Sequence, residues 1–147
     1  MDGTGTRYGQ PAPDAESPVV ELTDVECWDL LDGCELGRLA FRLVDEVHLV
    51  PLNYVVEGRT LLFRTAPGSK LFAAALESDA AFEIDHHERD SAWSVVVRGA
   101  LRRLTDLEAH RIDGATSVPW VPTQKAEVVE LAPVAVTGRR FFLDRRV

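Results

Sequence analysis

The chain has little cysteine, little lysine and no long apolar run. Its 147 residues include two cysteines, Cys27 and Cys34, with no Cys-x-x-Cys motif and no N-terminal secretory pattern. This usage is typical of reduced thiols in a cytosolic protein, and nothing in the sequence argues for a disulfide. No segment approaches the roughly 18–20 apolar residues that span a bilayer. We therefore expect a cytoplasmic protein without a membrane partner.

The chain is acidic overall, and its lysines are few. The formal net charge is -8 and the sequence pI is about 4.9, a poor basis for non-specific nucleic-acid binding. Acidity does not exclude a small phosphorylated ligand, because a few local cations can dominate one pocket. Only two of the 16 basic residues are lysine, and one of these, Lys70, directly follows Gly68-Ser69.

The length and composition predict one domain. With 46% hydrophobic and 27% charged residues, the chain can bury one core but is too short for two ordinary domains. Residues 1–18 are rich in Gly, Pro, Asp, Thr and Ser, which is typical of a disordered tail. We therefore expect a single domain over residues 19–147.

Periodicity predicts a mainly β protein with short helices. Thr23 and Glu26 occupy capping-box positions of a helix that ends before Gly33, and further short helices are expected at 70–76 and from Thr105 to near Gly114. Six strands are expected, at 36–44, 47–56, 59–65, 80–85, 93–104 and, broken across Pro133, 127–142. The first three strands are expected to form an antiparallel meander, and the whole an antiparallel barrel.

Two residues within these strands are unusual there. Pro51 donates no ladder hydrogen bond, so we expect it at an edge, at a bulge or facing a ligand. Gly99 indicates a bulge or a close backbone approach.

The segment from Arg64 to Lys70 has the composition of an anion-binding loop. Backbone N–H groups at a helix start, a hydroxyl and fixed cations together hold a phosphate. Here Arg64 and Thr65 end a strand, Gly68 permits a tight turn, and Ser69-Lys70 open a helix. The nucleotide P-loop pattern is absent. The residues alone leave open an ordinary helix start, in which Ser69 is the N-cap and Lys70 a surface cation.

Five blocks, in this order, resemble a known family. They are Leu36-Gly37-Arg38-Leu39-Ala40-Phe41, Val50-Pro51-Leu52-Asn53-Tyr54, Phe63-Arg64-Thr65-Ala66-Pro67-Gly68-Ser69-Lys70, Phe82-Glu83-Ile84-Asp85 and Trp93-Ser94-Val95-Val96-Val97-Arg98-Gly99. Together they are similar to the pyridoxamine 5′-phosphate oxidase-like proteins, over roughly Leu22 to Phe142. The resemblance implies a six-stranded antiparallel split barrel of the FMN-binding type.

The resemblance also implies a cofactor site. The FMN phosphate would lie at Arg64, Thr65, Ser69 and Lys70, and the flavin ring against Pro51, Leu52, Asn53 and Phe63, with Trp93 and Ser94 nearby. In the family the site usually forms between two subunits of a homodimer, so Trp120 or a turn at Gly138-Arg139-Arg140 is expected to come from the partner. From the residues alone, Asn53 is equally a polar strand end and Trp93 equally a core residue.

The resemblance implies an FMN-dependent oxidoreductase acting on a small molecule. The true oxidase is longer and holds its substrate with a C-terminal arginine and histidine set, whereas residues 139–147 contain no histidine. Pyridoxamine phosphate oxidation is therefore not expected. Three alternatives stay open: a non-catalytic FMN carrier or sensor, a deazaflavin-dependent reductase, and a dimeric scaffold with an empty site.

Other chemistries have no support in the sequence. His86 and His87 follow Asp85 at a strand end, but neighbouring strand residues face opposite sides, so no metal site is expected. No Ser-His-Asp order or nucleophile elbow occurs, so hydrolase chemistry is not expected either.

Overall fold

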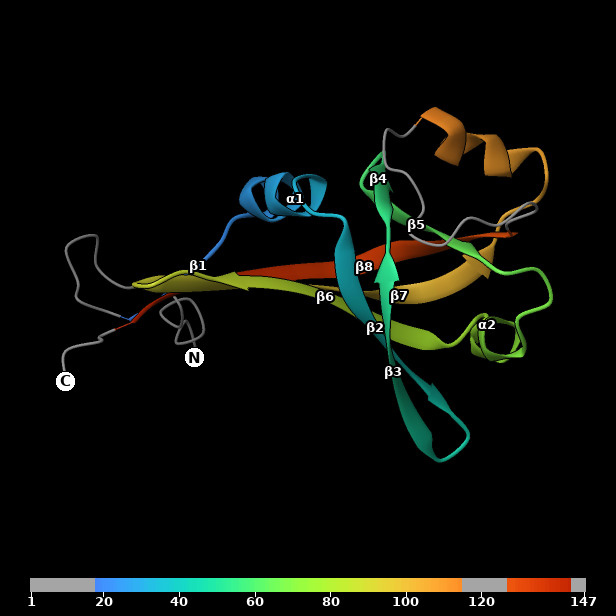
Figure 1. Cartoon of the computed structure of the whole chain (residues 1–147), viewed down its shortest axis with the longest axis horizontal. Coiled ribbons are helices and arrows are strands. Elements are labelled where there is room, and N and C mark those ends of the chain that lie inside the picture. Colours follow the sequence, from blue (N-terminus) through green and yellow to red (C-terminus); the bar gives the residue numbers. More distant parts are fainter. Residues whose placement is uncertain (1–17, 115–126, 144–147) are drawn as a thin grey trace, which may run out of the picture.

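The structure is a computed structural model that describes residues 18–114 and 127–143 (Figure 1). Most of the predicted N-terminal tail, residues 1–17, lies outside the described residues, as does Trp120. The elements in chain order are β1 (Val19–Glu21), α1 (Asp24–Asp32), β2 (Leu36–Leu43), β3 (Glu46–Asn53), β4 (Val55–Glu57), β5 (Thr60–Thr65), α2 (Lys70–Ala75), β6 (Asp79–His87), β7 (Ser91–Arg103), the 3-10 helix η2 (Glu108–Gly114) and β8 (Glu127–Phe142).

Helix α1 begins and ends as its sequence predicts. The Glu26 N–H donates to Thr23 Oγ1 at 3.2 Å, and the Thr23 N–H donates to Glu26 Oε1 at 2.8 Å, which completes the capping box. Gly33 is the C-cap. The helix lies along the sheet (Figure 1) and buries Trp28 and Leu31. Both thiols of the chain are free; Cys27 is buried and Cys34 half-buried.

The strands form one antiparallel sheet in the order β3-β2-β6-β7-β8-β5-β4, with β1 paired to β8. The first pair of the predicted meander, β2 with β3, is confirmed, and so is the hairpin turn at Glu57-Gly58, where β4 pairs with β5. The meander does not continue as one flat sheet, because β5 pairs on its other side with β8 and not with β3. The predicted strand at 47–56 divides at Tyr54 into β3 and β4, which lie at opposite ends of the order. One residue separates these two end strands, so the sheet has to curl into a half-barrel.

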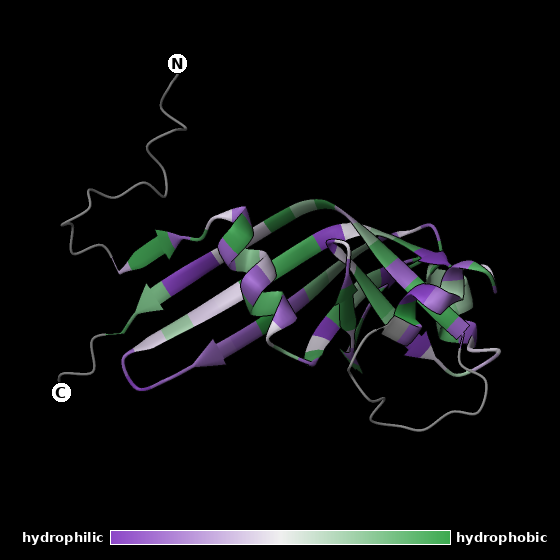
Figure 2. Cartoon of the chain, turned by 90° about the horizontal axis from the view of Figure 1, so that it is seen from above, coloured by the Kyte–Doolittle hydropathy of each residue, from purple (hydrophilic) through white to green (hydrophobic). Residues whose placement is uncertain are grey.

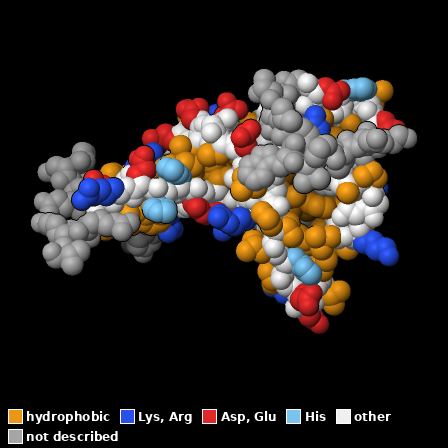
Figure 3. Space-filling model, viewed as in Figure 1, with side chains coloured by type: hydrophobic (Ala, Val, Ile, Leu, Met, Phe, Trp, Pro, Cys, Tyr) orange, Lys and Arg blue, Asp and Glu red, His pale blue; other side chains and the backbone are white. Residues whose placement is uncertain are grey.

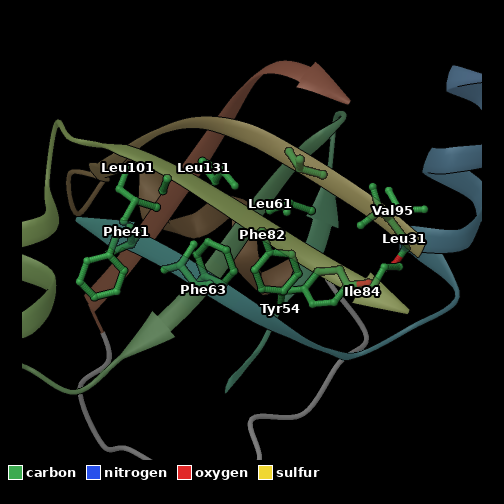
Figure 4. Close-up of a cluster of buried hydrophobic side chains, with 14 of the residues drawn as sticks. Leu31, Phe41, Tyr54, Leu61, Phe63, Phe82, Ile84, Val95, Leu101 and Leu131 are labelled. Carbon is green, nitrogen blue, oxygen red and sulfur yellow. The ribbon is translucent and has the colours of Figure 1, made fainter. Parts of the chain in front are cut away.

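The core fills the inside of this curl. Phe82 lies at its centre, with its ring 4.9 Å from that of Tyr54 and 5.3 Å from that of Phe63 (Figure 4). Along β2 the buried residues alternate with more exposed ones, as in a strand with one face on the core. Figure 2 shows hydrophobic and hydrophilic residues following one another along the strands.

Strand β8 differs from its prediction. It runs without a break from Glu127 to Phe142, and the irregularity expected at Pro133 is a register shift against β7, between Arg98 and Gly99. The bulge predicted at Gly99 is thereby confirmed. A Cβ at Gly99 would lie 2.1 Å from the Ala132 carbonyl oxygen, which explains the glycine. The turn expected at Gly138-Arg139-Arg140 is wrong, since these residues pair with β7 inside β8.

A second, smaller core lies under η2. It contains Leu62, Val128 and Ile112. Ion pairs lie beside this second core. The Arg111 guanidinium lies 2.7 Å from a carboxylate oxygen of Glu130 and 2.7 Å from one of Glu57. The Glu130 side chain is only 7% exposed, so its charge is compensated inside the protein. Among the helices of residues 18–114 and 127–143, none is long and apolar enough to span a membrane.

Candidate functional site

The predicted phosphate loop connects β5 to α2. Gly68 has a φ of 72°, which permits the tight turn, and a Cβ there would meet nothing within 4 Å. Ser69 is the N-cap of α2, and its Oγ accepts a hydrogen bond from the Phe72 N–H at 3.3 Å. Ser69 is therefore an ordinary helix N-cap, as one of the two interpretations of the sequence predicted. Its hydroxyl can still donate its own proton to an anion.

The cations of this loop are accessible. Lys70 is exposed and Arg64 half-exposed, and neither forms an ion pair with another described residue. Thr65 is buried, and its hydroxyl donates to the Glu127 carbonyl at 3.4 Å. The Gly68 N–H donates to the Glu127 carboxylate, also at 3.4 Å. A carboxylate therefore already faces one N–H group of the loop, where an anionic ligand would compete with it.

Three of the six residues predicted at or near the flavin ring, Pro51, Asn53 and Ser94, lie on the outer face of the sheet. Cα pairing places Pro51 opposite Arg38 and Asn53 opposite Leu36, and places Ser94 opposite Asp85. Pro51 is exposed, and Asn53 and Ser94 are half-buried. The predicted edge position of Pro51 is confirmed, because β3 is the last strand of the sheet on this side.

The other three of these six residues, Leu52, Phe63 and Trp93, face inward. Phe63 is fully buried against Phe82, so its side chain supports the fold and offers no surface to a ligand. Leu52 and Trp93 are partly buried and pack against the main core. Trp93 also lies 6.1 Å from the ring of His86. Trp93 therefore packs as a core residue, which is one of the two alternatives that the sequence left open.

A charged cluster lies between Pro51 and Ser94 on the outer face, and sequence reasoning missed it. One Arg38 nitrogen lies 3.2 Å from the Glu83 carboxylate and 3.1 Å from the Asp85 carboxylate. Burial, with the neighbouring Asp85 as a further cause, raises the pKa of Glu83 to about 7 despite the attraction of Arg38. Glu83 can therefore take up or release a proton near neutral pH.

The histidines lie on three elements: His48 on β3, His86 and His87 on β6, and His110 on η2. His86 and His87 are exposed at the end of β6. No group of three or more His, Cys, Asp or Glu side chains with metal-binding geometry occurs in the part of the chain that the structure describes.

A curled antiparallel half-barrel with a strand-to-helix loop at its end defines the class of protein. The sequence profile of the pyridoxamine 5′-phosphate oxidase family matches residues 23–140. The chain belongs to this family, and its fold is the split barrel of the pyridoxamine 5′-phosphate oxidase-like proteins.

Three solved structures are similar to the chain. An FAD-binding protein from Mycobacterium smegmatis is 41% identical, with a TM-score of 0.74, over 83% of this chain and 99% of that one. A protein from Corynebacterium glutamicum, provisionally described as a pyridoxamine 5′-phosphate oxidase, is 36% identical with a TM-score of 0.82, over 90% and 99%. An FAD-binding protein from Mesorhizobium loti is 27% identical with a TM-score of 0.70, over 86% and 98%.

Proposed function

We propose that this protein binds a flavin nucleotide and uses it as an FMN-dependent oxidoreductase on a small molecule. The observation that carries the proposal is its membership of the family, together with its similarity to two structures of FAD-binding proteins. Bound flavin would supply hydride or electron transfer. The chain's own contribution would be to hold the phosphate and to orient the ring.

The loop between β5 and α2 fits a phosphate in its chemistry. Lys70 and Arg64 supply two accessible cations, Ser69 a hydroxyl, and Gly68 an open turn with a backbone N–H. Glu127 opposes binding, because its carboxylate already accepts from the Gly68 N–H. On the outer face, Asn53 and Ser94 offer hydrogen-bonding side chains for the polar edge of the ring.

Several finer points belong to the same proposal. FMN is the predicted cofactor, FAD shares its phosphorylated half, and a deazaflavin remains the alternative. A carrier or sensor without turnover is the second candidate function.

We also propose a homodimer with the site at its interface. Val44 and Leu49 on the β2–β3 hairpin are exposed, and Figure 3 shows many hydrophobic side chains there, which supports a partner at this hairpin. The cytoplasmic location stays a prediction.

The first experiment identifies the cofactor. The purified protein should absorb in the flavin bands or quench the fluorescence of added FMN, and mass analysis of the molecule released by denaturation distinguishes FMN, FAD and deazaflavin. If saturating FMN, FAD and deazaflavin all fail to bind, the proposal is wrong. Bound flavin that neither NADH nor NADPH reduces would favour the carrier or sensor.

The second experiment tests the loop. Lys70→Ala and Arg64→Ala should each weaken FMN by about 10- to 100-fold and riboflavin much less, because a charge-assisted phosphate contact is lost. Glu127→Gln should strengthen FMN, because it removes the competing charge. Arg89→Ala, at an exposed arginine between β6 and β7, is the matched control and should change neither. Equal weakening of FMN and riboflavin would show that the loop cations act on the fold.

A further inference from the structure

The inner face of the adjacent strands β7, β8 and β5 ends in polar side chains at the predicted phosphate loop. Leu101 on β7 and Val129 on β8 are buried in the main core. Side chains alternate along a strand, so Arg103, two residues after Leu101, faces the same side as the core. Glu127, two residues before Val129, does so too, and its Cα partner is Thr65, the last residue of β5. Arg103 and Glu127 therefore lie where the core ends and the loop to α2 begins.

The Glu127 carboxylate is shared between two donors. Its Oε1 accepts from the Gly68 N–H at 3.4 Å, and its Oε2 lies 3.4 Å from the Arg103 guanidinium. Both distances are longer than the roughly 2.7–3.2 Å of most N–H···O bonds. The Glu127 and Arg103 side chains are 33% and 46% exposed, so water also screens their attraction. The carboxylate is therefore held loosely, and a stronger anion can displace it from Gly68.

A flavin phosphate at this loop would need the N–H group that Glu127 occupies. A phosphate monoester carries up to about two negative charges at neutral pH and has several strong acceptor oxygens, so it competes well with one carboxylate and repels it. Glu127 already contacts Arg103 through its second oxygen, so a cation is within reach when it leaves Gly68. Without Arg103 the displaced carboxylate would stay uncompensated beside the phosphate. Arg103 therefore favours phosphate binding without touching the phosphate.

We propose that Arg103 is a positioning residue of the flavin site: Glu127 occupies the Gly68 N–H in the empty site and moves to Arg103 when the phosphate binds. This role rests on the proposed flavin function and concerns the regulation of its phosphate site. A site that has to displace its own carboxylate binds the phosphate less tightly than the loop cations alone allow. The flavin nucleotide should therefore exchange with free flavin in solution.

The test is a double-mutant cycle on FMN affinity, measured by fluorescence quenching, with riboflavin as the matched ligand without a phosphate. Glu127→Gln keeps the shape of the side chain and should strengthen FMN by about threefold and slow its release. Arg103→Gln should weaken FMN by about threefold in the presence of Glu127, and by less than about 1.5-fold in the Glu127→Gln background. The affinity for riboflavin should change by less than about 1.5-fold in all three variants.

The controls separate charge from folding. Arg103→Lys keeps the positive charge and should restore FMN affinity to within about twofold of wild type. Arg89→Gln and Glu88→Gln each remove an exposed charge at the turn between β6 and β7, at the opposite end of β7 from Arg103, and should change neither affinity. Circular dichroism and the unfolding midpoint check that each variant is folded. If Arg103→Gln fails to fold, Arg103→Met, which keeps an apolar stem, replaces it in the cycle.

Three results would overturn the proposal and leave the flavin function intact. The first is FMN binding that Lys70→Ala weakens and Arg103→Gln does not. The second is an equal loss of FMN affinity on Arg103→Gln with and without Glu127, which would show that Arg103 contacts the phosphate directly. The third is an equal loss of FMN and riboflavin, which would assign Arg103 to the fold. If wild type binds no flavin at all, the proposed function fails, and the role of Arg103 fails with it.

Discussion

The hydroxyl of Tyr54 should hold α1 to the half-barrel, and Tyr54→Phe tests this. Tyr54 lies between β3 and β4, is 2% exposed, and donates through its Oη to the Leu31 carbonyl at 2.6 Å. Burial raises the pKa of this phenol, so it remains a donor over the whole working range. Phenylalanine keeps the ring and its edge-to-face contact with Phe82, so only the hydrogen bond is lost.

The magnitude follows from what the Leu31 carbonyl retains. A lost buried hydrogen bond with an unsatisfied partner costs about 1–3 kcal/mol. The Leu31 oxygen still accepts from the Cys34 N–H at 3.4 Å, so we expect the lower part of this range, about 1–2 kcal/mol. For a chain of this length the unfolding temperature should then fall by about 3–8 °C.

The assay is urea unfolding followed by tryptophan fluorescence, in which Trp28 on α1 reports on the helix. The midpoint should fall with an unchanged m-value, since the same surface is exposed on unfolding. Thr137→Val removes a hydroxyl from an exposed position of β8 and should change stability by less than about 0.5 kcal/mol. A loss below about 0.3 kcal/mol for Tyr54→Phe, or a changed m-value, would refute the reasoning.

Three further variants test the rest of the fold. The folded pKa of Glu83, about 7, lies above its ordinary value of 4.5, so between these pH values the folded state binds more protons than the unfolded state. The free energy of unfolding should therefore fall by up to about 1 kcal/mol as pH rises from 4.5 to 7. In Glu83→Gln the unfolding temperature from thermal melts should change less over this pH range. Arg111→Met leaves the buried Glu130 carboxylate with one fewer partner and should cost about 2–4 kcal/mol in urea, whereas the double variant with Glu130→Gln should cost less than the sum of the singles. Gly99→Ala forces a Cβ toward the Ala132 carbonyl and should lower stability by about 1–3 kcal/mol; a neutral result would contradict the bulge geometry.

Local features of the fold could be predicted because their causes are local. The capping box of Thr23 and Glu26 involves residues three apart, and its hydrogen bonds form as the sequence predicts. The glycine that marks the bulge at position 99 is required by one close backbone contact. The pairing order was not predictable in this way. Strand β5 is adjacent to β4 in sequence but pairs also with β8, where Phe63 faces Val129, 66 positions later.

The site was predictable by residue type but not by direction. Pro51 and Phe63 both entered the predicted site through the family resemblance, yet one is exposed on the outer face and the other is fully buried. A shift of one residue in strand register places every side chain of the strand on the opposite face. A small error in the expected register therefore moves a residue from the surface, where it could contact a ligand, into the core. The Arg38–Glu83 pair spans 45 positions and left no signal in spacing.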